Sequence, residues 1–151
     1  MFDNYLIRSD SLKNTYDGDT ITGFSIAVRI ANYRGVFLSL HTGYFLEVDG
    51  EQYPREVQKF EINGKPPRSF DELKGQVWEH WDYDDEAILH IEKPGGLAPG
   101  EHLVRFQQCV IAAYGYLPTD EEWVKAPPAL GTGAGSDKTP QIITYHLPLM
   151  Q

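Results

Sequence analysis

The stretch Thr20–Ile30, TITGFSIAVRI, decides the class of fold. Its large apolar residues Phe24, Ile26, Val28 and Ile30 occupy every second position and alternate with small or polar residues. Because successive side chains of a β-strand point to opposite sides, this period of two indicates a strand with one apolar face against a core. The other face is small or polar and is expected to point outward.

Short runs of the same kind follow, and turn residues separate them. Asp49-Gly50 comes directly after the run Tyr44–Val48, and Asn63-Gly64 comes after Phe60–Ile62. Both dipeptides favour two-residue hairpin turns, because a type I′ turn needs a positive φ at both central positions. Further strands are predicted at residues 36–40, 77–81, 87–92, 101–116 and 141–149, with a bulge or bend near residues 107–109.

One short helical turn is expected after the second of these turns. Ser69 and Glu72 have the spacing of a capping box, in which a hydroxyl and a carboxylate satisfy the first backbone amides of a helix. Gly75 follows closely, so the helix has room for only a turn or two.

These elements predict an all-β protein: an antiparallel β-sandwich, jelly-roll-like, built from about eight to ten short strands with one short helical turn. The length of 151 residues suits a single domain, residues 1–151. Residues 126–140 are rich in Gly and Pro and are expected to form a flexible or draped segment. The terminal strand at 141–149 is expected to dock on the protein's own sheet, and another chain's surface is the alternative.

Composition narrows the classes of function. The formal net charge of −9 argues against a nucleic-acid or anionic-membrane binder, because phosphate contacts need clustered cations. Cys109 is the single cysteine, which excludes an intramolecular disulfide and a zinc site built on cysteines. We find neither a signal peptide nor a run of about 18 apolar residues, so a cytoplasmic protein is expected.

The motifs reveal no self-sufficient catalytic centre. G-x-S-x-G, P-loop and G-x-G-x-x-G patterns are absent from the sequence. His90 and Glu92 share a face of a predicted strand, and with His80 or His102 they form an alternative metal site. Surface or hydrogen-bonded strand residues are the simpler interpretation. The acidic run Asp82–Glu86 places carboxylates together as calcium ligands would be, and a solvated turn is the simpler interpretation there.

Aromatic side chains provide the candidate contact residues. Tyr114, Tyr116 and Trp123 cluster in a predicted loop, where aromatic rings can anchor a protein interface or stack on a sugar. Packing onto their own sheet is the alternative. Trp78 and Trp81 face opposite sides of a predicted strand, so one can belong to the core and the other to a contact surface.

Five segments, taken in order, resemble the small (β) subunit of bacterial C-glycoside deglycosidases over roughly the first 118 residues. They are Met1–Ile7, Gly43–Gly50, Phe60–Lys65, Arg68–Leu73 and Lys93–His102. Each segment by itself contains turn residues that are common in proteins. The specificity of the resemblance therefore lies in the order of the segments and in the chain length.

The resemblance implies a β-sandwich without a catalytic centre of its own. It implies a partner, a larger α subunit that is a (β/α)₈ barrel, in heterodimers assembled into a higher oligomer. The complex would cleave the C–C bond between a sugar and an aromatic aglycone such as a flavonoid, after a separate oxidoreductase has made the 3-oxo glycoside. A divalent metal, expected to be manganese, would sit on the larger subunit, with no cofactor on this chain. Tyr114, Tyr116 and Trp123 would then lie at the partner interface or at the rim of the active site.

Two other functions stay open. A carbohydrate-binding β-sandwich module shares the fold, the acidity and the exposed aromatic residues, and needs no partner. A small metal-dependent jelly-roll isomerase or lyase would use His90 and Glu92. Sugar binding by the isolated chain would favour the first, and metal bound to the isolated chain would favour the second.

Overall fold

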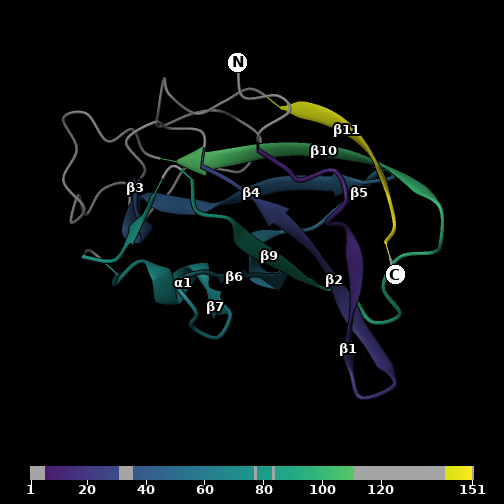
Figure 1. Cartoon of the computed structure of the whole chain (residues 1–151), viewed down its shortest axis with the longest axis horizontal. Helices are drawn as coiled ribbons and strands as arrows, with labels where there is room; N and C mark the ends of the chain where they lie inside the picture. The colour runs from purple at the N-terminus through teal and green to yellow at the C-terminus, as the bar shows by residue number, and fades with distance from the viewer. Residues whose placement is uncertain (1–5, 31–35, 77, 83, 111–141, 151) are drawn as a thin grey trace.

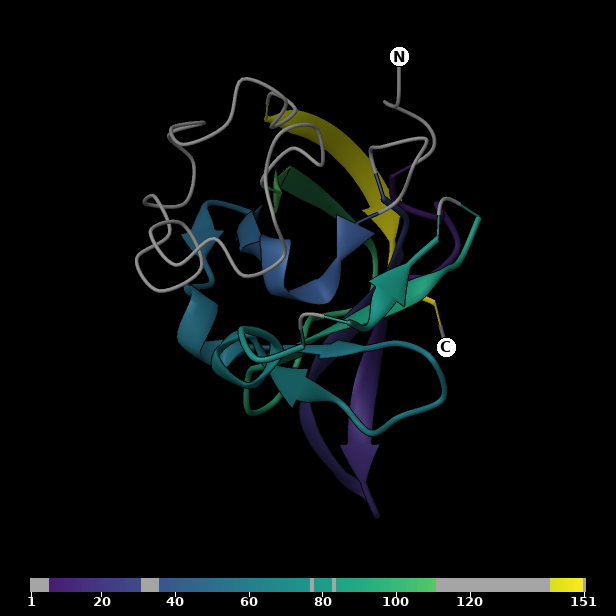
Figure 2. The same ribbon diagram turned by 90° about the vertical axis from the view of Figure 1, so that its left-hand side faces the viewer.

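The computed structural model describes residues 6–30, 36–76, 78–82, 84–110 and 142–150. These residues form two main antiparallel sheets in separate layers, which Figures 1 and 2 show from two directions. In this part of the chain the only helices are one short α-helix and two 3-10 turns. The predicted all-β sandwich is confirmed.

The first main sheet has five strands in the order β1-β2-β9-β6-β7. Their bounds are Lys13–Asp17 for β1, Thr20–Val28 for β2, Ala87–Glu92 for β9, Gln58–Glu61 for β6 and Arg68–Ser69 for β7. Phe24, Ile26 and Val28 of β2 are buried in the core, as their alternation predicts.

The second main sheet has four strands in the order β11-β10-β4-β5. Their bounds are Ile143–Pro148 for β11, Glu101–Val110 for β10, His41–Val48 for β4 and Glu51–Gln52 for β5. The pairing of β10 with β4 shifts register between Cys109 and Val110, which confirms the bulge expected there. The side chain of Cys109 lies outside the described part of the chain.

The turn residues behave as their chemistry requires. Asp49 and Gly50 have φ values of 51° and 88° and close the β4–β5 hairpin, and Asn63 and Gly64 have φ values of 59° and 72°. This second turn lies within a longer connection, since β6 and β7 pair only through Lys59–Ser69 and Phe60–Arg68.

The predicted capping box is formed at the start of α1, Phe70–Leu73. The amide of Glu72 donates to Ser69 Oγ at 3.2 Å, and the amide of Ser69 donates to Glu72 Oε1 at 3.0 Å. The helix therefore satisfies its first amides within one turn.

Two strand predictions are wrong in detail. Only Val36–Phe37 form a strand (β3), and Leu38–Leu40 form a 3-10 turn (η1) instead of continuing the alternation. Of the segment predicted as a strand at 77–81, the structure describes residues 78–81, and among these only His80–Trp81 form a strand (β8), which pairs with β3. The reason is tertiary: Leu38 N donates to Glu79 O at 2.9 Å and Ser39 N to Gln76 O at 3.3 Å, which fixes these two segments to each other.

A buried glutamine joins the two sheets. Gln58 of β6 accepts a hydrogen bond from Tyr44 N at 3.1 Å and donates to Tyr44 O at 2.7 Å and Tyr53 O at 3.0 Å. Gln58 follows η2, Arg55–Val57, which connects β5 to β6. Because all of these groups are paired, the polar link does not leave an unsatisfied amide in the core.

His41, at the start of β4, is buried among aromatic rings. Its ring centre lies 4.9 Å from that of Tyr44, 4.6 Å from Phe60, 5.2 Å from Phe70 and 5.1 Å from Trp81. Neither ring nitrogen of His41 has a hydrogen-bond partner in the described part of the chain. Burial lowers its pKa from 6.5 to about 3, so the imidazole is neutral at physiological pH.

The terminal strand docks on the protein's own sheet, as expected. β11 pairs antiparallel with β10 from Glu101–Pro148 to Phe106–Ile143. Beyond β11, Met150 bridges to Lys13 and its amide donates to Leu12 O at 2.7 Å. The end of the chain therefore contacts both sheets.

Candidate functional site

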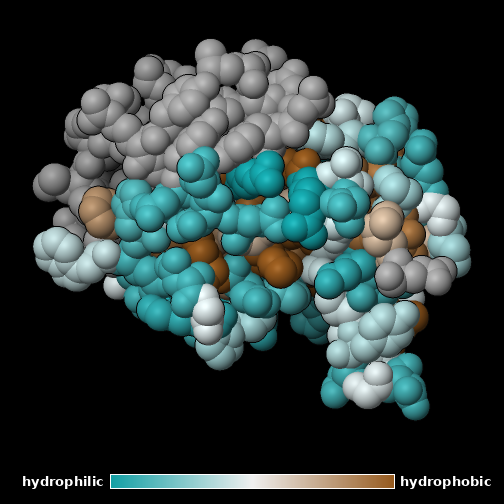
Figure 3. Space-filling model, viewed as in Figure 1, coloured by the Kyte–Doolittle hydropathy of each residue, from teal (hydrophilic) through white to brown (hydrophobic). Residues whose placement is uncertain are grey.

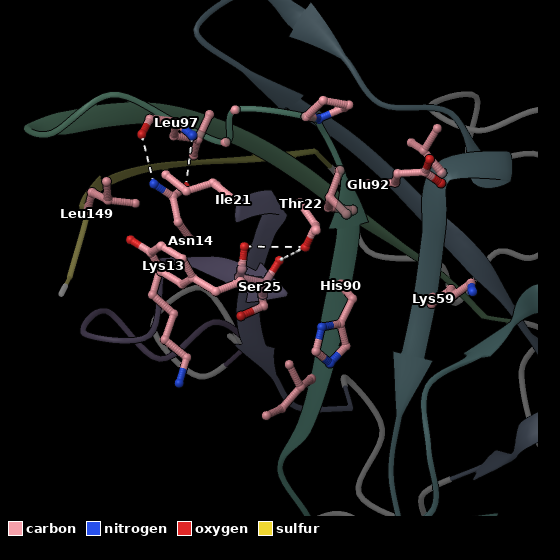
Figure 4. A pocket seen from close by; sticks show the side chains of 18 of the residues that line it. Lys13, Asn14, Ile21, Thr22, Ser25, Lys59, His90, Glu92, Leu97 and Leu149 are labelled. Carbon is pink, nitrogen blue, oxygen red and sulfur yellow. Dashed lines mark hydrogen bonds between the residues drawn. The ribbon is translucent and has the colours of Figure 1, made fainter. Parts of the chain in front are cut away.

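The face of the five-stranded sheet that points away from the core is hollowed into an open groove of about 1860 Å³. We call it the outer groove. Figure 4 shows residues from β1, β2, β9 and β6 around it, with Leu97 and Leu149 at one end. The residues used below to describe it are Lys13, Thr15, Thr22, Ser25, Lys59, Glu61, His90 and Glu92.

A row of polar side chains crosses the outer groove from strand to strand. Lys13 of β1 is opposite Ser25 of β2, Ser25 is opposite His90 of β9, and His90 is opposite Lys59 of β6. Because residues at paired positions share a face of the sheet, the four side chains form one line of hydrogen-bonding groups. The β1–β2 hairpin and two strands distant from it in sequence, β9 and β6, build this line.

The floor of the groove follows from the small residues of β2. Ser25 faces the groove, and Gly23 and Ala27 occupy the neighbouring positions on the same face. This face is small, as predicted, but it is not exposed: Ser25 and Ala27 are both buried. Residues preceding β1 run along the edge of β2, since Ala27 N donates to Ser11 Oγ at 2.9 Å and Arg8 N donates to Ala27 O at 3.1 Å.

One wall of the groove is held by a reciprocal amide pair. Asn14 donates to Leu97 O at 3.0 Å, and Leu97 N donates to Asn14 Oδ1 at 2.8 Å. Gly96 has a φ of 61°, and a Cβ there would lie 2.4 Å from Asn14 Oδ1 and 2.6 Å from Ile21 Cγ2. A side chain at position 96 would therefore push this loop away from β1 and open the wall.

His90 and Glu92, the alternative metal ligands, are not brought together with the other histidines. His90 Nε2 hydrogen-bonds to Glu61 Oε1 at 2.8 Å, and Glu92 is exposed. His80 Nδ1 instead contacts Asp82 Oδ1 at 2.6 Å. In the described ranges, no group of three or more His, Cys, Asp or Glu side chains is placed to share a metal ion.

The chemistry of the outer groove is that of binding. It combines hydroxyls, an imidazole, ammonium groups and carboxylates with the apolar side chains of Ile21 and Ile88. His90 Nε2 pairs with Glu61, and no hydrogen bond between Ser25 and His90 is found among the described residues.

Both ring nitrogens of His102, the remaining candidate ligand, are hydrogen-bonded within the chain. We call this arrangement the Asp49–His102 clamp. His102 Nδ1 lies 2.5 Å from Asp49 Oδ2 and His102 Nε2 lies 2.7 Å from Ala98 O. Asp49 Oδ1 also accepts a hydrogen bond from Leu103 N at 2.9 Å. Burial lowers the pKa of His102, but the bonds to Asp49 and Ala98 outweigh it and raise the pKa above its usual value.

Substitution of Asp49 by asparagine tests this clamp. Asparagine tolerates the positive φ and keeps an acceptor for Leu103, but it removes the charge that favours protonated His102. We expect the pKa of His102 to fall, and the free energy of unfolding to decrease by about 1 kcal/mol at pH 6, because the half-exposed carboxylate is partly screened.

The sign of the pH dependence is fixed by the raised pKa. The stabilisation by His102 is fully present below its unfolded pKa and is lost as the pH rises through the folded pKa. The loss caused by D49N should therefore shrink at alkaline pH. An NMR titration of His102 checks the shift, with E61Q, which removes the partner of His90, as the control. An unchanged His102 pKa in D49N would contradict the assignment.

The acidic run Asp82–Glu86 is partly paired within the chain. Asp82 contacts His80, and Glu86 forms ion pairs with Arg8 at 2.6 Å and Arg29 at 3.5 Å. Trp81 Nε1 donates to Asp85 O at 2.8 Å, and the amide of Asp85 donates to Asp82 O at 3.0 Å. The run is a turn stabilised by its own chain, which supports the simpler interpretation.

The two tryptophans near this turn have opposite environments, as predicted. Trp81 is fully buried, whereas 88% of Trp78 is exposed. Tyr114, Tyr116 and Trp123 lie outside the described residues, as does the segment 126–140, so their roles remain predictions.

Sequence reasoning missed the polar row of the outer groove, because it missed β1. The polar sequence KNTYD of this edge strand shows no apolar alternation. A signal was present in Asp17-Gly18-Asp19, where Gly18 takes a φ of 63° in the turn to β2.

The comparison with known proteins concerns most of this sandwich. The family model described as C-glycoside deglycosidase beta subunit matches residues 2–114, a range that contains every strand from β1 to β10. The chain belongs to the C-glycoside deglycosidase beta subunit family. The C-glycoside deglycosidase beta subunit of Eubacterium cellulosolvens is 32% identical over 134 residues, which are 88% of this chain and 83% of that relative.

Membership of a beta subunit family implies a partner subunit. The match contains the strands that line the outer groove, the Asp49–His102 clamp and Trp78, while β11 and the groove residue Leu149 lie beyond its end. Among the described residues, no helix of this deglycosidase subunit has the length and apolar content needed to cross a membrane.

Proposed function

We propose that this chain is the non-catalytic β subunit of a heteromeric C-glycoside deglycosidase, a carbon–carbon lyase acting on 3-oxo-C-glycosides such as oxidised flavonoid C-glucosides. The family match over residues 2–114 is the observation that carries the proposal. The cytoplasmic location expected from the sequence fits it and remains a prediction.

The proposed reaction is an elimination. A C-glycoside has no leaving-group oxygen to protonate, so the hydrolytic route with two carboxylates fails. A ketone at C3 acidifies the proton at C2, which a general base removes; the bond from C1 to the aryl carbon then breaks, and the aryl carbon takes up a proton. Stabilisation of the negative charge on the C3 oxygen is assigned to a divalent metal, expected to be manganese, on the larger subunit.

In this proposal the larger subunit is a (β/α)₈ barrel whose active site opens at its loop face. The β subunit packs near that opening, stabilises the barrel and helps to exclude water.

Co-expression of this chain with its genomic neighbours, to find a larger partner protein, tests the proposal. Native mass should show a complex containing both chains, and the complex should release the aglycone from a 3-oxo-C-glycoside. The larger chain alone should be much less active or unstable, and this chain alone should be inactive. A free monomer that binds no larger chain, or full activity without this chain, would overturn the proposal.

The aromatic cluster of Tyr114, Tyr116 and Trp123 gives a prediction at the interface. Replacing Trp123 by alanine is expected to weaken association of the subunits by about tenfold or more, because buried aromatic anchors dominate interface energies. Analytical ultracentrifugation of the co-expressed complex measures this. Unchanged assembly and activity would exclude Trp123 as a contact residue.

Carbohydrate binding by this chain itself is a second candidate, and the outer groove favours it. His90 and Lys59 of the polar row offer the imidazole and ammonium groups that hydrogen-bond to sugar hydroxyls. Calorimetric titration of the isolated chain with a C-glucoside, with K59A as the test variant and K74A as the control, separates this candidate from the first. A heat of binding that is lost in K59A and retained in K74A would support carbohydrate binding by this chain.

A further inference from the structure

We propose that Trp78 anchors this chain to the larger subunit of its enzyme, by inserting its indole into an apolar pocket that is rimmed by basic side chains on that subunit. The inference rests on the proposed function, because it takes the larger subunit as the occupant of this surface.

Exposure singles out Trp78. The large hydrophobic residues exposed in the described part of the chain are Trp78 at 88%, Tyr16 at 62%, and Leu103 and Met150 at 40% each. On the face drawn in Figure 3, hydrophobic residues are few and lie mostly in hollows between hydrophilic ones. A nearly bare tryptophan is unusual on such a surface, and tryptophan is the residue most enriched at the energetic centres of interfaces.

The backbone around Trp78 is fixed on both sides. Gln76 O accepts a hydrogen bond from Ser39 N at 3.3 Å, and Glu79 O accepts one from Leu38 N at 2.9 Å. The amide of Gln76 also donates to Leu73 O at 3.0 Å, at the end of α1. Trp78 therefore projects from a bend that is pinned before and after it.

The neighbouring residue Glu79 strengthens this support. Its carboxylate accepts hydrogen bonds from the two terminal nitrogens of Arg68, at 2.9 and 2.7 Å, from Lys65 Nζ at 2.8 Å and from Asn63 Nδ2 at 2.9 Å. The Arg68 bond leads the interactions that lower the pKa of Glu79 to about 2. A preorganised backbone loses less conformational entropy on binding, so the indole can contribute more of its burial energy to association.

Charge indicates the chemistry of the partner. Residues 71–86, which surround Trp78 in sequence, contain seven Asp and Glu residues and one Lys. Two of the seven are ion-paired to cations elsewhere in the chain: Glu79 with Arg68 and Lys65, and Glu86 with Arg8 and Arg29. Asp71 and Asp82 are 86% and 73% exposed on their side chains, and Asp84 and Asp85 are exposed as well. A partner surface with Lys and Arg around an apolar pocket is complementary to this arrangement.

The location of Trp78 provides a matched control. Trp78 lies between α1 and β8, whereas Tyr16 lies in β1; Figure 1 shows α1 and the β1–β2 hairpin at opposite ends of the molecule. Both residues are exposed aromatics, so their substitution should affect the folding of the isolated chain equally little. Only the surface near α1 should matter for assembly.

The test measures the dissociation constant of the complex formed by the full chain and the co-expressed larger subunit. W78A is expected to raise it by at least thirtyfold, W78F by less, and Y16A by less than threefold. The double variant D84N/D85N is expected to slow association at low salt and to have little effect at high salt. Thermal unfolding of each isolated variant confirms that the fold is retained.

The outcomes separate this inference from the proposed function. If the wild-type chain binds the larger subunit and W78A binds equally well, the anchor is overturned while the proposed function stands. If W78A and Y16A weaken binding equally, the effect is not local to Trp78 and the anchor is again overturned. If the wild-type chain forms no complex at all, both are overturned.

Discussion

Replacing His41 by leucine is expected to stabilise the sandwich and to remove much of its sensitivity to acid. His41 is fully buried among Tyr44, Phe60, Phe70 and Trp81, and neither ring nitrogen is paired among the described residues. An unsatisfied buried polar group costs about 1–3 kcal/mol, and a leucine of similar size carries no such cost. At pH 7 we therefore expect the free energy of unfolding of H41L to be about 1 kcal/mol larger than that of the wild type.

The larger effect appears on acidification. The folded-state pKa of about 3 lies below the unfolded value of 6.5, so between these values the unfolded chain binds a proton that the folded chain does not. The stabilisation that follows from this difference in pKa is therefore fully present above pH 6.5 and is lost as the pH falls towards 3. From pH 7 to 4.5 this single group is expected to cost about 2–3 kcal/mol.

Urea denaturation of both proteins at several pH values measures this difference. The advantage of H41L should grow as the pH falls, while H146Q, which alters an exposed histidine of β11, should follow the wild type. Parallel pH profiles for H41L and the wild type would show that His41 is not the buried neutral group described above.

A methyl group at position 23 is expected to disrupt the five-stranded sheet. A Cβ on Gly23 would lie 1.9 Å from Ile91 O and 3.0 Å from Lys93 N, and both are backbone atoms of or next to the neighbouring strand β9. Since β2 pairs with β9 over six residue pairs, the strands would have to separate there. We expect G23A to lower the free energy of unfolding by about 3–5 kcal/mol.

Gly75 provides the matched control for this substitution. The nearest atom to a Cβ at position 75 is Glu72 O at 3.9 Å, an ordinary contact. G75A should lie within about 1 kcal/mol of the wild type and is expected to stabilise slightly by restricting the unfolded chain. Urea denaturation compares the two variants. Recovery of soluble G75A together with insoluble G23A would also agree with a backbone clash at position 23. Equal stabilities of G23A and G75A would refute it.

Elements fixed by local chemistry were predictable from the sequence. The turns at Asp49-Gly50 and Asn63-Gly64 need positive φ values that these residues adopt easily, and the capping box at Ser69 needs only four consecutive residues. The alternation in β2 also survives in the structure, because one face of this strand forms the core.

Elements fixed by tertiary contacts were not predictable. Leu38–Leu40 have the alternation of a strand, yet hydrogen bonds to Gln76 and Glu79 bend them into η1. The polar row of the outer groove depends on the register of four strands drawn from positions 13 to 90, which one sequence does not reveal. Gly23, inside a strand pattern, was a local sign of close backbone approach.

The order in which the strands pair has a kinetic consequence. β10 joins β4 and β11 across long stretches of chain, and Met150 bridges to Lys13 near the opposite end of the sequence. Folds dominated by such distant contacts form slowly, because loop-closure entropy is lost before the distant contacts form and stabilise the structure. Until β11 pairs, one edge of β10 exposes free amides and carbonyls to other chains. During refolding at high concentration, this edge is where misassembly is expected to begin.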